Sequence, residues 1–244
     1  MVVVDESLRE RVRAIDWYHT IELAPGLVTQ GMFDHRPLVE RFGLPGDLSG
    51  RRALDVGTFD GFWAFELERR GANVVAIDVD DTRDYDWPPR YRRREPETRG
   101  ESFRIARELR GSHAERVATT IYDATPEKLG GAFDLVFVGA VLIHVRDPML
   151  ALERLAELCR GQLVLAEEYS RRLEPLPFVK AAEFRAHAPH MTWWRPTTRT
   201  WMTMVHAAGF EDVRRHARLR VPFRGTRRGG VPHVVIHARG PGRA

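Results

Sequence analysis

Three carboxylates follow apolar segments in the first half of the sequence. Asp55 ends RRALD, Asp78 ends NVVAID, and Asp123 follows RVATTIY. Such runs are typical of buried strands, and parallel strands present their carboxyl ends at one edge of a sheet. An acid there accepts ribose hydroxyls or an adenine amino group, so Asp78 and its neighbour Val79 are the predicted ribose contacts. Asp123 and Ala124 are the predicted contacts of the base. The alternative is that the three acids merely cap their own strands.

A glycine-bearing turn joins the first of these strands to a helix. It reads Asp55-x-Gly57-x-x-x-Gly61, with Thr58 and Phe59 between the glycines, and the amphipathic run FWAFELERRGA follows. Glycines here let a ligand approach the backbone at the helix N-terminus. A dinucleotide site has the spacing G-x-G-x-x-G, and an acid would repel its pyrophosphate. The turn therefore predicts a nucleoside pocket without a phosphate site, and the acid suits a cationic, amino-acid-like group.

Candidate catalytic groups follow the fourth and fifth apolar runs. Gly139 ends FDLVFVG as a predicted cofactor contact, and His144, whose imidazole titrates near neutrality, lies just beyond it. Glu167 and Glu168 end LVLAEE, and because neighbours on a strand alternate, one should face the pocket. His19, in the motif WYH, is a third candidate beside His144 and Glu167. The alternatives are that His144 caps a helix or bonds the cofactor, and that His19 helps to seal the core.

Large aromatic residues suggest how a substrate is held. Tyr18 and Phe33 belong to the N-terminal segment, and Trp193, Trp194 and Arg195 belong to the run MTWWRP. Aromatic walls bind flat rings, so these five residues are the predicted substrate contacts and residues 171–195 a predicted lid. The alternative is that the tryptophans pack the last helix against the sheet.

Composition limits the class of protein. The 244 residues are 43% hydrophobic and 30% charged, as in a globular chain. No run approaches the roughly 18 apolar residues of a membrane helix, and no secretory signal is evident. The chain has a single cysteine, Cys159, which excludes an intramolecular disulfide and fits a reducing cytoplasm. Cys159 lies in the apolar pattern of a predicted helix, so we expect its side chain to pack in the protein core. His187 and His190 have no third ligand nearby, so we predict no metal site.

The order of the elements predicts an α/β fold. The strand-like runs of residues 51–170 are RRALDVG, ANVVAIDV, RVATTIYDA, FDLVFVGAV and GQLVLAEEY, and they alternate with the helical runs FWAFELERRGA and PMLALERLAELC. This alternation predicts a Rossmann-like, doubly wound sheet. A helix, TTRTWMTMVHAAGF, and two strands, EDVRRHARL and PHVVIHAR, complete seven mostly parallel strands.

The chain is predicted to form one domain, 1–244, with four zones. Residues 1–50 are an N-terminal cap with a helix in SLRERVRAIDWYHTI and another near 37–42, and residues 51–170 are the cofactor-binding core. Residues 171–195 form the irregular, aromatic lid, and residues 196–244 the last helix and strand pair.

Positive charge is concentrated in the C-terminal part. Residues 213–244 hold nine arginines and no acid, so residues 1–212 sum to −5 (4 − 9). A second group, Arg90, Arg92, Arg93 and Arg94, surrounds Tyr91. Arginine beside an aromatic ring suits phosphate and base stacking, whereas a solvated surface is the simpler interpretation. The tail arginines lie on strand-like segments where side chains diverge, so we predict no tight RNA site.

These motifs together resemble the class I S-adenosylmethionine-dependent methyltransferases. LDVGTFDG is similar to that family's first motif, AIDVDD to its second, YDA to its third, and FDLVFVGAVLIHVRDPMLALERL to its fourth strand and following helix. The resemblance implies S-adenosylmethionine as cofactor, held by the residues named above. The sequence departs from the family at Phe59, where a middle glycine is common.

A finer resemblance covers most of the chain. WYHTIELAPGLVTQGMFD, VLIHVRDP and MTWWRPTTRTWMTMVHAAGF look like the branch that contains the tRNA wobble-uridine carboxymethyltransferases, which use a carboxylated donor. In that branch a tyrosine that helps to bind the extra carboxylate precedes the histidine, and here Ile143 stands before His144. We therefore expect ordinary S-adenosylmethionine.

The function expected from the sequence is methyl transfer to an oxygen or nitrogen of a small molecule. The alternatives are modification of a tRNA wobble base and a non-catalytic nucleoside- or RNA-binding protein on the same fold. No membrane partner is expected, and the oligomeric state is left open.

Overall fold

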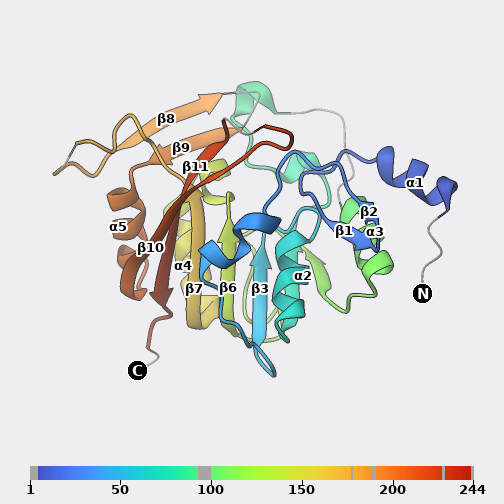
Figure 1. The fold of residues 1–244 in the computed structure, drawn as a ribbon. Helices are drawn as coiled ribbons and strands as arrows, with labels where there is room; N and C mark the ends of the chain where they lie inside the picture. The colour runs from blue at the N-terminus through green and yellow to red at the C-terminus, as the bar shows by residue number, and fades with distance from the viewer. Residues whose placement is uncertain (1–4, 93–99, 177, 188–190, 227–228, 243–244) are drawn as a thin grey trace.

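A seven-stranded sheet forms the centre of the computed structural model, which describes residues 5–92, 100–176, 178–187, 191–226 and 229–242 (Figure 1). Its strands are β3 (Arg52–Val56), β4 (Asn73–Asp78), β5 (Glu115–Ala118), β6 (Phe133–Gly139), β7 (Cys159–Glu168), β10 (Glu211–Val221) and β11 (Val231–Arg239). The order is β10-β11-β7-β6-β3-β4-β5; β3 to β7 pair in parallel, and β11 is antiparallel to both its neighbours. The predicted Rossmann-like, mostly parallel sheet is confirmed.

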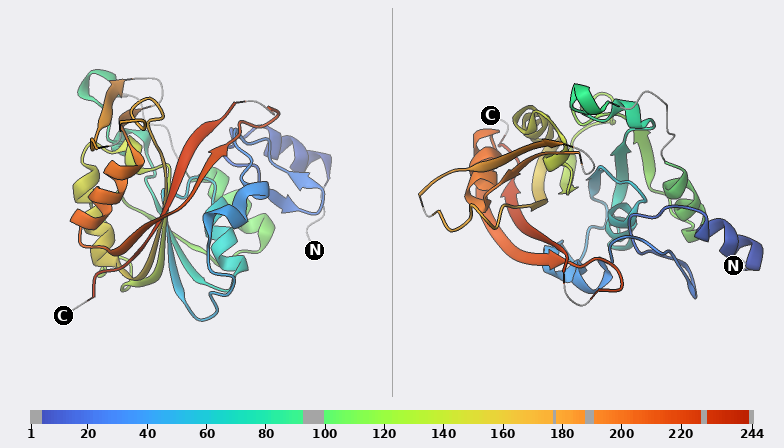
Figure 2. Two further views of the ribbon diagram at one scale, coloured as in Figure 1. Left: turned by 60° about the vertical axis from the view of Figure 1, so that its left-hand side comes forward. Right: turned by 90° about the horizontal axis from the view of Figure 1, so that it is seen from above.

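Helices cover both faces of the sheet (Figure 2). One face carries α2 (Phe62–Arg69) and α3 (Glu101–Arg110), and the other carries α4 (Pro148–Leu158) and α5 (Thr198–Ala207). Helix α1 (Glu6–Arg13) lies at the edge of the molecule, and the short 3-10 turns are η1 (Arg36–Phe42), η2 (Thr82–Asp84), η3 (Pro89–Tyr91) and η4 (Leu142–His144). Alternate strand residues feed two cores: Leu54 and Val56 pack with α4 and α5, whereas Ala53 packs with α2 and α3. Because the helices cover the two faces of the sheet, the carboxyl ends of the parallel strands remain as the edge where a ligand can bind.

The N-terminal cap differs from the predicted helix. α1 ends at Arg13 rather than continuing to residue 21. The Trp17 indole folds back and donates to Val12 O at 2.7 Å, which buries the ring, and the following backbone pairs with residues around Phe33. A small hairpin of β1 (Glu22–Ala24) and β2 (Leu27–Val28) follows. The prediction was wrong here because burial of Trp17 overrides the helical pattern.

Three further predictions are corrected. The third strand ends at Ala118, not at Asp123, because residues 119–123 turn away from the sheet. Cys159 is buried, but it begins β7 instead of ending a helix. Residues 171–195 are not irregular throughout, since β8 (Ala182–His187) and β9 (Thr192–Pro196) form an antiparallel hairpin. The predictions about Arg93, Arg94 and His190 lie outside the described residues.

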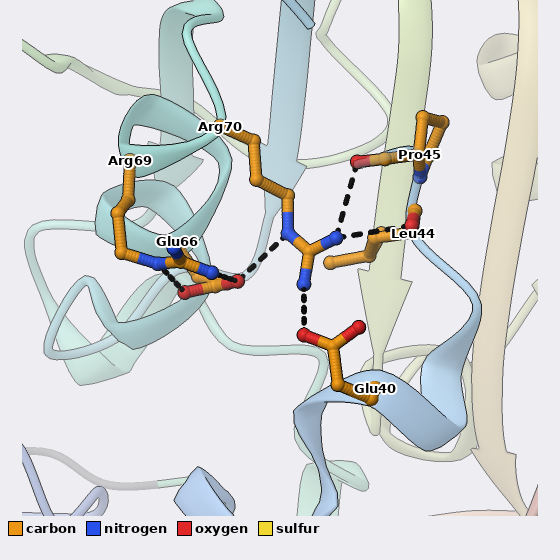
Figure 3. A network of polar contacts seen from close by, with 6 residues as sticks. All are labelled: Glu40, Leu44, Pro45, Glu66, Arg69 and Arg70. Carbon is orange, nitrogen blue, oxygen red and sulfur yellow. Dashed lines mark hydrogen bonds and ion pairs between the residues drawn. The ribbon is translucent and has the colours of Figure 1, made fainter. Parts of the chain in front are cut away.

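A buried guanidinium attaches the cap to the core (Figure 3). Arg70, which follows α2, donates to Glu66 at 2.7 Å and to Glu40 of η1 at 2.8 Å. It also donates to the carbonyl oxygens of Leu44 and Pro45, at 3.0 and 3.1 Å. The side chain is only 4% exposed, so these four acceptors satisfy a charge that water does not reach.

We expect Arg70→Ala to lower the free energy of unfolding by about 1–2 kcal/mol, because two carbonyls and a carboxylate lose their donor. The matched control is Arg69→Ala. Arg69 also pairs with Glu66, but it is 60% exposed, so its loss should cost under about 1 kcal/mol. Denaturant unfolding of both variants measures the difference, and equal losses would contradict the role given to Arg70.

Candidate active site

A cavity of about 300 Å³ opens where β3, β4 and β6 end. Among the predicted site residues, the following line it: Tyr18, His19, Asp55, Gly57, Phe59, Asp78, Val79, Gly139 and His144. The others lie behind the wall or outside it: Thr58, Gly61, Asp123, Ala124, Glu167, Phe33, Trp193, Trp194 and Arg195. The structure thus brings the glycine-rich turn, the second strand end and two of the three catalytic candidates to one place.

The turn after β3 has the left-handed conformations that its sequence suggested. Gly57 and Gly61 have φ of +70° and +92°, and Phe59 has φ of +49°, a conformation that usually favours glycine. A Cβ on Gly57 would lie 2.4 Å from a Val141 methyl group, so a larger residue does not fit without a shift. Phe59 thus has the left-handed backbone conformation that a glycine adopts most easily. Thr58 is buried under the turn, and Gly61 precedes α2 as its N-cap.

Two carboxylates stand beside this turn. Asp78 accepts from the amides of Phe59 and Val79, both at 2.8 Å. Asp55 is buried, and its Oδ2 has no hydrogen-bond partner. Burial raises the pKa of Asp55 to about 7, and the charge of Asp78 adds to the effect. An unpartnered carboxylate oxygen in a cavity wall fits a ligand that brings a donor or a positive charge.

The predicted contacts of the nucleobase, Asp123 and Ala124, do not line the cavity. Asp123 is exposed and accepts from the Thr120 hydroxyl at 2.6 Å, while Ala124 is buried away from the cavity. The turn that ends β5 early carries both residues past the cavity. Thr119, Thr120, Ile121 and Tyr122 line the wall instead.

Asp60 is a residue that sequence reasoning missed. It is fully buried in the glycine-rich turn, and its Oδ2 accepts from the amides of Tyr18 at 2.7 Å and His19 at 2.8 Å. Burial raises the pKa of Asp60 to about 6. These bonds position Tyr18 and His19 against the cavity.

Removing this acceptor leaves two buried amides unpaired. We therefore expect Asp60→Ala to lower the free energy of unfolding by about 1–2 kcal/mol. Asp60→Asn, which retains an acceptor oxygen, should stay within about 0.5 kcal/mol of wild type. Thermal and denaturant unfolding test this pair, and a loss in Asn as large as in Ala would show that the charge, rather than the acceptor, matters.

The histidine His19 is neutral in the folded protein. Burial lowers its pKa well below the usual value, and His35, whose ring centroid is 5.3 Å away, lowers it further. Burial likewise lowers the pKa of His35 to about 3 and that of His233 to about 4. His19 Nδ1 is buried with no hydrogen-bond partner, 3.7 Å from Asp60 Oδ2. A neutral imidazole in the wall can exchange hydrogen bonds with a ligand but supplies no positive charge.

His144 is held by the hairpin of β8 and β9. Its Nδ1 lies 3.2 Å from the carbonyl oxygen of Met191, which also lines the cavity. Because a carbonyl only accepts, Nδ1 carries the proton in this arrangement and Nε2 is the atom able to take one. The helix-cap alternative is wrong, since Asp147 caps α4.

Glu167 supports the cavity from behind. Its Oε1 accepts from the amides of Val141 at 2.9 Å and Leu142 at 2.8 Å, and Oε2 is buried without a hydrogen-bond partner. Burial raises the pKa of Glu167 to about 8. The side chain therefore fixes the segment that leads to His144 and does not line the cavity. The neighbouring Glu168 pairs with Arg195 at 2.8 Å, which ties β7 to β9.

The two tryptophans bind backbone rather than face the cavity. Trp193 donates from its indole to Asp86 O at 2.6 Å, and Trp194 donates to Arg146 O at 2.9 Å. The Asp86 carboxylate also accepts from the Tyr122 hydroxyl at 2.8 Å. These contacts hold the hairpin across two loops that border the cavity, so Met191 alone of the described lid residues reaches it.

Phe33 lies behind Tyr18, with ring centroids 5.0 Å apart, and stacks on Phe223 of the β10–β11 loop. It therefore supports Tyr18 and does not line the cavity.

Across the described ranges, no helix is long and apolar enough to cross a membrane. In the same residues, no group of three or more His, Cys, Asp or Glu is arranged to hold a metal ion.

The fold is Rossmann-like, with a cavity at the carboxyl ends of its parallel strands, and comparisons with known proteins give the family. Residues 33–215 match the model of a methyltransferase domain family. No curated protein sequence matches the chain. The N-terminal domain of EvdMO1, solved with S-adenosylhomocysteine bound, is similar over 96% of both chains, at 16% identity and a TM-score of 0.68.

A second similar structure is the Burkholderia thailandensis 1,6-didemethyltoxoflavin-N1-methyltransferase, solved with 1,6-didemethyltoxoflavin and S-adenosylhomocysteine. It is 17% identical over 80% of this chain and 72% of that one, with a TM-score of 0.53. The chain belongs to the methyltransferase domain family. It is an S-adenosylmethionine-dependent methyltransferase, and the resemblance of its motifs to that class is confirmed.

Proposed function

We propose that the protein transfers a methyl group from ordinary S-adenosylmethionine to an oxygen or nitrogen of a small molecule. The observation that carries this proposal is His144 in the wall of a small cavity, its Nδ1 held by Met191 O. The fold neighbour that is a 1,6-didemethyltoxoflavin-N1-methyltransferase supports it by analogy.

The donor fits the residues present. Asp78, at the end of β4, would accept from the ribose hydroxyls, and the unpartnered Asp55 Oδ2 would accept from the amino group of the methionyl part. When bound, the donor supplies a sulfonium methyl that is already strongly electrophilic. Among the described residues that line the cavity there is no lysine or arginine. An extra carboxylate on the donor would therefore find no counter-ion, which adds to the argument from Ile143.

The protein's own task is to align the acceptor and remove its proton. His144 Nε2 takes the proton of a hydroxyl, and Met191 O stabilises the imidazolium through Nδ1–H. Tyr18 presents a phenol in the same wall, and burial raises its pKa, so it stays a hydrogen-bond donor. Glu167 acts through the backbone it holds and is a positioning residue.

A screen with isotopically labelled S-adenosylmethionine, run in parallel on fractionated small-molecule extracts and on purified tRNA, tests the function. We expect label in a low-molecular-weight product, and a roughly hundredfold or larger loss with His144→Gln, which cannot take the proton. Unchanged transfer by His144→Gln would exclude the assigned base. Label in tRNA and in no small molecule would favour wobble-base modification.

A further inference from the structure

The loop that joins β7 to β8 carries apolar side chains on the surface. Phe178 is 89% exposed, Val179 49% and Leu176 46%. Figures 1 and 2 show this golden loop projecting beyond β8 and α5, away from the body of the protein. Adjacent large apolar side chains at a projecting tip are typical of a surface that meets another apolar phase.

Positive side chains flank this tip. Arg171 and Arg172 precede it and Lys180 follows it, and all three are exposed. The carboxylate of the loop, Glu174, is engaged by Arg218 and by the Thr198 amide. The loop therefore presents an apolar tip, Leu176, Phe178 and Val179, with positively charged side chains on both sides of it.

A groove of about 760 Å³ lies beside the loop and continues the same chemistry. Leu176, Val179 and Lys180 form one wall, and Arg199 of α5 and Arg215 of β10 form others. In the part of the chain that the structure describes, Lys180, Arg199 and Arg215 make no ion pair with a carboxylate. The acid Asp212 of the groove pairs with Arg239 at 2.9 Å. Part of the arginine-rich tail thus faces this groove.

Against the expectation from the sequence that there is no membrane partner, we propose that the tip and the groove dock the protein onto an anionic lipid surface. Phe178 and Leu176 enter the boundary between headgroups and acyl chains, while the cations meet the headgroups. An anionic bilayer offers a partner for both kinds of side chain, because its negatively charged headgroups lie directly above its apolar acyl chains. A second copy of the chain would bring the same positively charged side chains to this surface, and like charges repel each other. The docking is separate from methyl transfer and needs no acceptor.

Co-sedimentation of the full chain with vesicles tests the proposal. We expect binding to phosphatidylcholine vesicles that contain a quarter phosphatidylglycerol, and at least tenfold weaker binding to phosphatidylcholine alone, since each cation near an anionic bilayer contributes roughly fivefold. Leu176→Ser/Phe178→Ser should weaken binding roughly tenfold or more. Lys180→Gln/Arg199→Gln/Arg215→Gln should weaken it and flatten its dependence on salt.

Matched controls come from surfaces outside the tip and the groove. Met32→Ser removes an apolar side chain that is 54% exposed, and Arg11→Gln/Arg107→Gln removes two exposed cations of α1 and α3; both should bind as wild type does. Unchanged melting temperatures show that the variants fold. The proposal is overturned by absence of binding to anionic vesicles at low salt, or by equal binding of the tip variant. A dimer in sedimentation velocity that the tip variant abolishes would also overturn it, in favour of a second copy.

Discussion

Asp78→Ala is expected to weaken binding of S-adenosylhomocysteine by roughly ten- to hundredfold while the fold persists. A charged acceptor of two ribose hydroxyls is lost, and buried hydroxyls without an acceptor cost roughly 1–3 kcal/mol. Asp78 also accepts from the Phe59 and Val79 amides, so its loss loosens the turn that contacts the ligand. Calorimetric titration gives the affinity, and circular dichroism reports the fold.

Asp123→Ala is the matched control for this variant. The sequence placed Asp123 beside the base, but its side chain is exposed, does not line the cavity and only accepts from the hydroxyl of Thr120. We therefore expect affinity within about threefold of wild type. If Asp123→Ala lost more affinity than Asp78→Ala, the assignment of Asp78 as the ribose acceptor would be wrong.

The second large effect is a dependence of stability on pH at Glu167. Burial raises its pKa to about 8 from an ordinary value of 4.5. Because the folded-state pKa is the higher one, its contribution to stability is fully present below pH 4.5 and is lost as pH rises through 8. The loss is about 1.4 kcal/mol per pH unit and approaches roughly 4–5 kcal/mol over the whole window.

Glu167→Gln removes the charge but keeps an oxygen for the Val141 and Leu142 amides. We expect it to match wild type within about 1 kcal/mol at pH 4.5 and to exceed it by several kcal/mol at pH 8. Glu167→Ala leaves both amides unpaired and should be less stable than the Gln variant throughout. Denaturant unfolding at several pH values measures the differences; a Gln variant whose advantage does not grow with pH would refute the buried, raised-pKa carboxyl.

Much of the fold follows from patterns within short stretches. The strands β3, β4, β6, β7 and β11 are largely apolar runs with polar ends, and the turn from Asp55 to Gly61 carries its own conformational signal in its glycines. Even Phe59, the departure from the family pattern, keeps the left-handed backbone. These features depend on neighbours in the sequence, so the sequence shows them directly.

Contacts between distant segments were not predictable in this way. Asp60 binds amides that lie more than 40 residues earlier, and Asp86 binds the Tyr122 hydroxyl 36 residues later. Neither contact could be predicted from the sequence, because the partners lie far along the chain and a backbone amide leaves no mark on residue type. Trp193 was predicted to face a substrate, but its indole N–H requires a buried acceptor and finds Asp86 O. A signal was present for Asp60 alone, as a second acid inside the glycine-rich turn.

The central claim is that this cavity binds ordinary S-adenosylmethionine, and one calorimetric comparison tests it most directly. The wild-type protein is titrated with S-adenosylmethionine and with its carboxylated analogue under the same conditions. We predict that the ordinary donor binds at least tenfold more tightly, because the described cavity wall has four carboxylates, Asp55, Asp78, Asp84 and Asp86, and neither lysine nor arginine. Equal or tighter binding of the carboxylated donor, or no binding of either, would contradict the account.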